Sequence, residues 1–335
     1  MISRAALSGE ELKQRINSAK ETRPPLIEGL IHEGSVIMTS SEPGAGKSVL
    51  TACIMAQASL ALPVFGQLFV PRPLNCYYIP FERGAQEIEE RFKHIQESIP
   101  IAYEHISIND SFMGMNVINE RHADEIFSRI KSDADRCFGG KIDIIFLDPI
   151  ISAVAGGIGN EDRASMLTRF TTRLQVAFGC ALWMNHHTTK DTYTSDGSKI
   201  EKDDPFYGSQ YLKAHCTGGF FMQRRAADAG PVLTCKKDSH SCLLPKIELI
   251  YEPETYTVFM QGLGKSIPAK DRLLMAYRTF RSANKTVTFR EIQGCMMGVS
   301  DSHLRDLLRT PPFNTAFKMI SSNGSNTLYK PEAEI

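Results

Sequence analysis

The sequence predicts an α/β protein with a mainly parallel sheet, an antiparallel extension of that sheet and a small C-terminal winged helix-turn-helix domain. Three observations predict this fold: a glycine-rich turn between a strand and a helix at residues 41–48, strands that alternate with helices as far as residue 187, and short strands without helices after residue 218. We expect an N-terminal arm at residues 1–24, the α/β domain at 25–262 and the winged-helix domain at 263–335.

The elements of the α/β domain follow from apolar runs and turn residues taken in order. Ser8 and Glu11 have the spacing of a capping box that starts a short helix in the arm. The near-continuous apolar run at residues 142–148 is typical of a strand covered on both faces. Parallel strands are expected at residues 35–40, 75–82, 105–108, 142–148 and 181–185, with helices at 49–56, 85–96, 117–132 and 162–177 between them.

The later elements change in kind. Short strands at residues 219–223, 232–236, 246–251 and 256–261 predict the antiparallel extension, and the glycine-rich stretch 262–268 is the expected linker. Helices are expected at residues 271–282, from 288 and from 300, where Ser300 is a good N-cap. Two strands around a turn at residues 321–326 then complete a winged helix.

The turn at residues 41–48, SEPGAGKS, has the pattern of a phosphate-binding loop. Its two glycines let backbone N–H groups turn toward an anion at the positive end of the next helix. Lys47 is expected to reach the β- and γ-phosphates of ATP, and Ser48 to place its hydroxyl on Mg²⁺. Ser41 stands where the pattern usually has glycine, which loosens the match. The expected nucleotide-binding residues are Glu42, Pro43, Gly44, Ala45, Gly46, Lys47, Ser48 and Val49.

Polar residues that follow three later strands are candidates for chemistry at the same edge of the sheet. Asp148 is placed to hold Mg²⁺ together with Ser48, in part through water, although aspartate also ends strands as a turn former. Glu82 is placed to orient or deprotonate the attacking water, and the alternative is a surface glutamate paired with Arg83. One residue of the pair at 186 and 187 could sense the γ-phosphate, or either could be a satisfied core histidine.

These motifs together resemble the RecA-like ATPases of the RepA family, which belongs with the hexameric replicative helicases that include the DnaB type. The resemblance rests on residues 25–34 before the loop, 79–82, 147–148 and 186–190, and it covers residues 25–261. It implies a RecA-like P-loop core, ATP and Mg²⁺ as cofactors, and a homo-oligomeric, hexameric ring that moves on DNA. It also implies that Glu82 activates water, that Asp148 is the Walker-B acid and that His187 is the γ-phosphate sensor.

In such rings a neighbouring subunit supplies a basic group that stabilises the transition state. Lys236 is the candidate for this catalytic group, with Lys237, Arg224 and Arg225 as competitors. Because no arginine stands in the stretch 236–240, solvated surface lysines remain an equal alternative.

Two regions are candidates for contact with DNA. The loop after the histidine pair carries Lys190, Lys199 and Lys202 and would line a channel for single-stranded DNA, although nearby acidic residues dilute its charge. Residues 264–335 contain 11 Lys/Arg and 6 Asp/Glu, a net charge of +5 that leaves −5 on the rest of the neutral chain. In a winged helix, three basic residues would lie near the phosphates of duplex DNA: Arg305, Arg309 and Lys318. The alternative is that this domain serves protein contacts or ring assembly.

Composition bounds the remaining choices. The 8 cysteines include no CxxC pair, which favours reduced thiols and a cytoplasmic location. Because no 18-residue apolar run and no signal peptide is present, we expect no membrane contact. The leading hypothesis is a replicative DNA helicase of a plasmid, phage or mobile element. The alternatives are a DNA-binding regulatory or assembly ATPase whose winged helix selects a site, and a RecA-like recombinase.

Overall fold

The computed structural model describes most of the α/β core and parts of both ends. The described residues are 8–18, 24–82, 84–154, 161–188, 192–193, 199–200, 210–224, 230–260, 269–270, 273, 277, 286–294, 296, 299–321 and 328–331. The expected linker at 262–268 lies outside them, as do most of the expected helix at 271–282 and the tip of the expected hairpin at 322–327. No helix among the described residues is long and apolar enough to cross a membrane.

A nine-stranded sheet forms the centre of the protein, in the order β13-β12-β11-β10-β3-β7-β6-β4-β5. All neighbours from β10 to β5 run parallel, whereas β10, β11, β12 and β13 pair antiparallel. The predicted parallel sheet with an antiparallel extension is therefore confirmed. The parallel strands are β3 (Val36–Ser41), β4 (Cys76–Pro80), β5 (Ile106–Ile108), β6 (Ile144–Asp148), β7 (Ala181–His187) and β10 (Gly218–Gln223), and the extension consists of β11 (Val232–Asp238), β12 (Lys246–Glu252) and β13 (Thr257–Met260).

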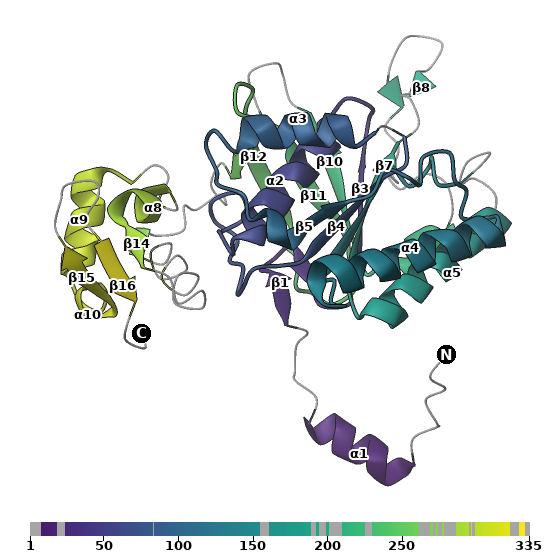
Figure 1. Cartoon of the computed structure of the whole chain (residues 1–335), viewed down its shortest axis with the longest axis horizontal. Helices are drawn as coiled ribbons and strands as arrows, with labels where there is room; N and C mark the ends of the chain where they lie inside the picture. The colour runs from purple at the N-terminus through teal and green to yellow at the C-terminus, as the bar shows by residue number, and fades with distance from the viewer. Residues whose placement is uncertain are drawn as a thin grey trace.

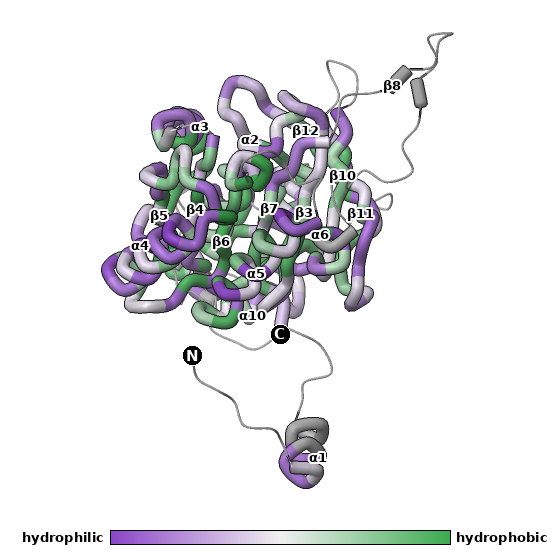
Figure 2. Tube along the Cα trace, turned by 90° about the vertical axis from the view of Figure 1, so that its right-hand side faces the viewer, coloured by the Kyte–Doolittle hydropathy of each residue, from purple (hydrophilic) through white to green (hydrophobic). Residues whose placement is uncertain are grey.

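Helices cover both faces of this sheet (Figure 1). On one face lie α2 (Lys47–Ser59) and α3 (Ala85–Ile95), and on the other lie α4 (Glu120–Phe138) and α5 (Glu161–Phe178). The short helix α6 (Gln210–His215) packs beside α5, and its Leu212 belongs to the same apolar cluster as α4 and α5. Each face has its own apolar cluster. Figure 2 shows hydrophobic stretches along the central strands and hydrophilic stretches along outer helices such as α4.

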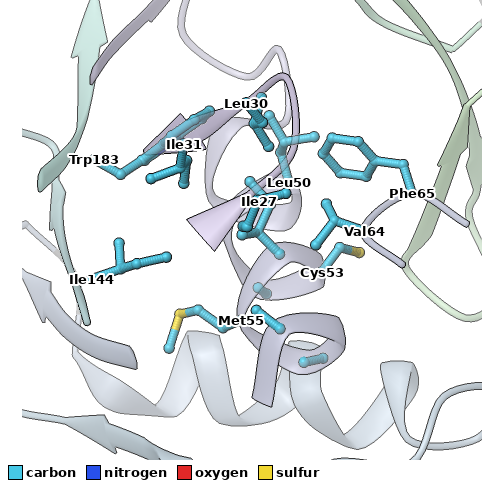
Figure 3. Packing of buried hydrophobic residues seen from close by; sticks show 14 of the residues in the cluster. Ile27, Leu30, Ile31, Leu50, Cys53, Met55, Val64, Phe65, Ile144 and Trp183 are labelled. Carbon is cyan, nitrogen blue, oxygen red and sulfur yellow. The ribbon is translucent and has the colours of Figure 1, made fainter. Parts of the chain in front are cut away.

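The loop helix α2 is held almost entirely inside the first of these clusters. Figure 3 shows Leu50, Cys53 and Met55 packed between the sheet and the segments on the other side of the helix. All three are at most 1% exposed. Burial on every side fixes the position of this helix and therefore of the loop that precedes it.

The outer helices show the local signals that a helix needs at its ends. In α4, the Asn119 side chain accepts hydrogen bonds from the N–H groups of Arg121 and His122, and Gly139 ends the helix in the left-handed region at φ 61°. The predicted capping box of α1 (Gly9–Ser18) is present, because the Ser8 N–H donates to Glu11 Oε2 at 2.7 Å and the Glu11 N–H donates to Ser8 Oγ at 3.3 Å.

The C-terminal region has a separate small core. Its three-stranded sheet has the order β14-β16-β15, and a buried cluster includes Phe289, Leu304 and Phe317. Ser300 caps α9 by accepting from the His303 N–H at 3.3 Å, as the sequence predicted. The elements are β14 (Val287–Thr288), α8 (Phe289–Gly294), α9 (Asp301–Arg309), α10 (Phe313–Ala316), β15 (Phe317–Ser321) and β16 (Leu328–Pro331).

Several short elements were not expected from the sequence. They are β1 (Pro25–Ile27), β2 (Ile31–His32), the 3-10 helix η1 (Tyr103–His105), β8 (Thr192–Tyr193), β9 (Lys199–Ile200), α6, α10 and β14. Each is too short for its periodicity to be distinguished from a turn. None of them alters the order of the central sheet.

Candidate functional site

Four parallel strands bring their carboxyl ends to one edge of the sheet. Ser41 at the end of β3 pairs in register with His187 at the end of β7, and Pro80 at the end of β4 pairs with Asp148 at the end of β6. Residues that are far apart in the sequence therefore meet at this edge. Open α/β sheets place ligands in the crevice outside this edge.

The glycine-rich loop turns here from β3 into α2. Gly44 has a φ of 76° and Gly46 a φ of 98°, which are left-handed conformations that favour glycine. Gly46 caps the helix without any side-chain hydrogen bond to the first turn. The backbone N–H groups at this helix start are thus left for an anion, and the helix dipole favours negative charge there.

The Lys47 ammonium is buried among oxygen and nitrogen acceptors at the base of the loop. Its Nζ donates to Ser41 Oγ at 2.6 Å and to the carbonyl oxygens of Ser41 and Glu42 at 3.3 Å each, and it lies 3.2 Å from His187 Nδ1. The serine that loosens the sequence pattern thus has a role of its own, since its hydroxyl holds the loop lysine and donates in turn to the Glu42 carbonyl at 2.8 Å.

Burial makes the charge of this lysine costly. Desolvation lowers the pKa of Lys47 to about 8, although the nearby carboxylates of Asp148 and Glu82 act in the opposite direction. An anionic ligand in the loop would supply the missing countercharge and favour the ammonium form.

His187 joins the lysine to the candidate catalytic glutamate. His187 Nδ1 lies 3.2 Å from Lys47 Nζ and can accept from the ammonium in the tautomer that carries its ring proton on Nε2. His187 Nε2 lies 3.9 Å from Glu82 Oε2, and the Glu82 side chain is 50% exposed. His187 therefore lies between Lys47 and the solvent-accessible carboxylate of Glu82 and contacts both.

Asp148 is the buried carboxylate of the site and is only 6% exposed. The Tyr78 hydroxyl donates to Asp148 Oδ2 at 2.8 Å, and burial, followed by the Asp148 charge, holds the pKa of this phenol far above its ordinary value. The Ser48 hydroxyl and the Asp148 carboxylate are the hard oxygen ligands that Mg²⁺ prefers. No cluster of three or more His, Cys, Asp or Glu among the described residues is arranged to hold a metal ion. Phosphate oxygens and water would supply the other ligands of a Mg²⁺ held by Ser48 and Asp148.

A buried polar network ties the strand of His187 to the loop helix. The Trp183 indole N–H donates to Asn185 Oδ1 at 3.0 Å, and Asn185 Nδ2 donates to Thr51 Oγ1 at 3.0 Å. All three side chains are at most 1% exposed. This network fixes β7 against α2 and thereby fixes the distance between His187 and Lys47.

One cavity of about 580 Å³ is lined by Lys47, Asp148, His187 and other residues of the candidate site. This cavity brings together most of the predicted site, but Glu42 and Ala45 are not on its wall. The Glu42 carbonyl oxygen accepts from Lys47 Nζ and, at 3.3 Å, from the Ala45 N–H. The predicted residues on its wall are Pro43, Gly44, Gly46, Lys47, Ser48, Val49, Glu82, Asp148 and His187. Three residues on the same wall were not expected from the sequence: Tyr78, Glu87 and Arg91. Glu87 and Arg91 form an ion pair at 2.9 Å.

The basic candidates for a trans-acting group lie at different positions along the strands. Because β11 runs antiparallel to β10, its end points away from the glycine-rich loop, and Lys236 lies level with the middle of β3, while Arg224 follows β10 at the loop edge. Lys237 Nζ donates to the carbonyl oxygens of Lys213 and Ala214. Lys236 is exposed, and Arg225 lies outside the described residues.

The candidates for DNA contact are described in part. Lys190 and Lys202 lie outside the described residues, and Lys199 lies on β9 without a described side chain. In the C-terminal region, the Arg305 guanidinium stacks 4.0 Å from the centre of the Phe289 ring, and Arg309 and Lys318 are exposed. After β6, Ala153 and Val154 are buried in the core, so the described part of the segment that follows this strand is packed rather than open.

Comparison with solved structures gives the fold. An ATPase domain of known structure matches 74% of this chain and 95% of its own length at 12% identity, with a TM-score of 0.52. A KaiC-like protein from the archaeon Pyrococcus horikoshii OT3 matches 70% of this chain and 93% of its own at 15% identity, with a TM-score of 0.45. The first likeness agrees with a RecA-like P-loop core for the nine-stranded sheet and its helices.

Sequence comparison gives the family. No curated protein sequence matches the chain. Residues 4–193, which are more than half of the chain, match the model of AAA_25, an AAA domain. This stretch contains the glycine-rich loop and all the strands that carry Glu82, Asp148 and His187. The chain therefore belongs to the AAA_25 family of AAA domains.

Proposed function

We propose that this protein is an ATP-hydrolysing, ring-forming DNA motor, a RepA-like replicative helicase of a plasmid, phage or mobile element. The observation that carries the proposal is the convergence of Lys47, Ser48, Glu82, Asp148 and His187 on one cavity beside a glycine-rich loop. A phosphate cradle, a magnesium-binding oxygen pair and a half-exposed carboxylate are the parts that hydrolysis of a nucleoside triphosphate requires.

The loop and Lys47 bind the triphosphate in this proposal. The N–H groups at the start of α2 hold the phosphate oxygens, and the Lys47 ammonium pairs with the β- and γ-phosphates. Ser48 and Asp148 hold Mg²⁺, Asp148 in part through water. Bound Mg²⁺ would offset the negative charge of the phosphates.

Glu82 accepts the proton of the attacking water. It is 50% exposed, so a water molecule can reach it, and it lies 3.9 Å from His187. His187 contacts both this carboxylate and the loop lysine, which is the position expected of a residue that senses the γ-phosphate. Loss of the γ-phosphate would change the contacts of Lys47 and, through His187, those of Glu82.

A neighbouring subunit in a hexameric ring completes the site with Lys236. Lys236 is exposed and stands near the end of β11 that points away from its own loop, which supports contact with a neighbouring subunit. Lys237 is the weaker candidate, since its ammonium is engaged by two carbonyl oxygens of its own chain.

DNA is the proposed partner of both ends of the motor. Lys190, Lys199 and Lys202 follow the sensor strand and would contact single-stranded DNA in the ring channel. The strand order β14-β16-β15 around α8 and α9 supports a winged helix, whose residues Arg309 and Lys318 are exposed for duplex phosphates and whose Arg305 lies on the same helix as Arg309.

Strand separation on forked DNA tests this function. With ATP and Mg²⁺ we expect unwinding, which a non-hydrolysable analogue should not support. Lys236→Ala is expected to bind MgATP and to lose about 1000-fold or more in turnover, as arginine-finger losses do. ATP-dependent binding to one DNA sequence without unwinding would contradict the helicase and support a regulatory ATPase. Filaments instead of closed rings in electron micrographs would support a recombinase.

A further inference from the structure

Tyr78 is a buried phenol on the wall of the nucleotide cavity that the proposed reaction does not yet use. It lies on β4, four residues before Glu82, and it is only 3% exposed. Successive strand residues point to opposite faces, and Tyr78, Pro80 and Glu82 at alternate positions all line the cavity. The phenol therefore belongs to the same surface as the candidate base.

The hydroxyl of Tyr78 has one well-defined partner, Asp148 Oδ2, at 2.8 Å. A buried hydroxyl without a partner is costly, so this bond orders both groups. Among the residues that the structure describes, no donor bonds Asp148 Oδ1. One carboxylate oxygen is thus fixed by the phenol and the other is left for solvent or for water bound to a cation.

Other nearby groups do not supply this restraint. The Lys47 ammonium donates to Ser41 and Glu42 rather than to Asp148. The adjacent cation Arg91 pairs with Glu87 at 2.9 Å. The phenol is a neutral donor, so it restrains the carboxylate without cancelling the charge that a divalent cation needs.

We infer that Tyr78 is a positioning residue that sets the rotation of the Asp148 carboxylate and, through it, the Mg²⁺ concentration at which the site holds nucleotide. This inference rests on the proposed ATPase function. Partners that orient metal-binding groups commonly change metal affinity about 10- to 100-fold when they are removed.

The neighbouring Tyr77 offers a matched control on the same strand. It is fully buried, and its hydroxyl donates to Asp133 Oδ2 of α4 at 2.7 Å, on the opposite face of the sheet. Tyr77→Phe removes the same atom as Tyr78→Phe, and it also breaks a tyrosine–aspartate hydrogen bond. Only Tyr78→Phe acts within the cavity.

The experiment measures binding of a fluorescent ADP analogue and turnover of ATP as functions of Mg²⁺ concentration. For Tyr78→Phe we expect the Mg²⁺ midpoint of both curves to rise about tenfold, with turnover at saturating Mg²⁺ within about threefold of wild type. For Tyr77→Phe we expect the midpoints of wild type. Thermal unfolding of both variants verifies that each is folded before the comparison.

Two failures are distinguishable in this design. If the wild-type protein shows no Mg²⁺-dependent binding or turnover of nucleotide, the proposed function is wrong. If wild type is active and both tyrosine variants share its Mg²⁺ midpoints, only the role of Tyr78 is wrong. Equal shifts in both variants would also overturn that role, because they would indicate a general effect of loosening β4.

Discussion

Replacing Lys47 with alanine is expected to lower ATP hydrolysis by about 100- to 1000-fold, the range seen when one preorganised charge-stabilising donor is removed. Lys47 is 4% exposed and lies between the loop, His187 and the cavity, whereas Arg91, the other cation described on the cavity wall, is paired with Glu87. Steady-state release of phosphate measures the effect. Lys93→Ala is the control, because Lys93 lies exposed on α3 outside the cavity wall.

The same variant is not expected to unfold the protein. Burial lowers the pKa of Lys47 to about 8, which means that the fold disfavours its ammonium form. Removing the side chain therefore removes an unfavourable buried charge, and the melting temperature should stay level or rise. Normal turnover in a folded Lys47→Ala protein would refute the assignment of the site.

Arg72→Ala is expected to cost about 2 kcal/mol of unfolding free energy, less than the loss of a fully buried ion pair, because the Arg72 side chain is 38% exposed while Asp143 is buried. Arg72 donates to both oxygens of Asp143 at 2.7 and 2.8 Å, and the Asn75 N–H donates to the same carboxylate at 2.9 Å. The Asp143 side chain is 3% exposed and stands at the entry to β6. Without Arg72, a buried carboxylate would lose most of its countercharge.

The effect should depend on pH with a definite sign. Burial alone would raise the pKa of Asp143, but the hydrogen bonds from Arg72 and Asn75 hold it below its ordinary value. A lowered folded-state pKa gives stability that is present above the unfolded pKa of about 3.9 and is lost as the pH falls through the folded pKa. The difference between Arg72→Ala and wild type should thus be largest near pH 7 and shrink below about pH 4.

Urea unfolding at both pH values measures this difference, and an exposed ion pair supplies the control. Arg129 and Glu125 form an i,i+4 pair whose side chains are 43% and 44% exposed. Arg129→Ala should cost less than about 1 kcal/mol. A similar small loss for Arg72→Ala, or a loss that does not change with pH, would contradict the role assigned to the Asp143 carboxylate.

Much of the site could be predicted from the sequence because local rules place it. A glycine-rich turn must lie between its strand and its helix, and parallel strands must end at one edge, so Lys47, Asp148 and His187 had to meet near one another. Glu82 was placed at the same edge by the same argument. The antiparallel extension followed from short strands without helices.

Other features of the site and the core depend on contacts between residues far apart in the chain, and a single sequence does not show which of these residues meet. In the sequence, Ser41 is only a departure from the phosphate-binding-loop pattern. The structure shows that its hydroxyl accepts a hydrogen bond from the Lys47 ammonium at 2.6 Å. Arg72 and Asp143 lie 71 positions apart, and nothing in the local sequence joins them. Tyr78 is the instructive case, since counting back from Glu82 with the strand period of 2 would have placed it on the wall of the site.

Comparison of binding and turnover in Glu82→Gln tests the central claim, that this edge of the sheet is a site of ATP hydrolysis. The substitution keeps the shape of the side chain and removes its ability to accept a proton. We predict a loss of turnover of about 100-fold or more with MgATP affinity within about threefold of wild type, as for removal of a general base. Turnover equal to that of wild type, or a loss of affinity as large as the loss of turnover, would contradict the account.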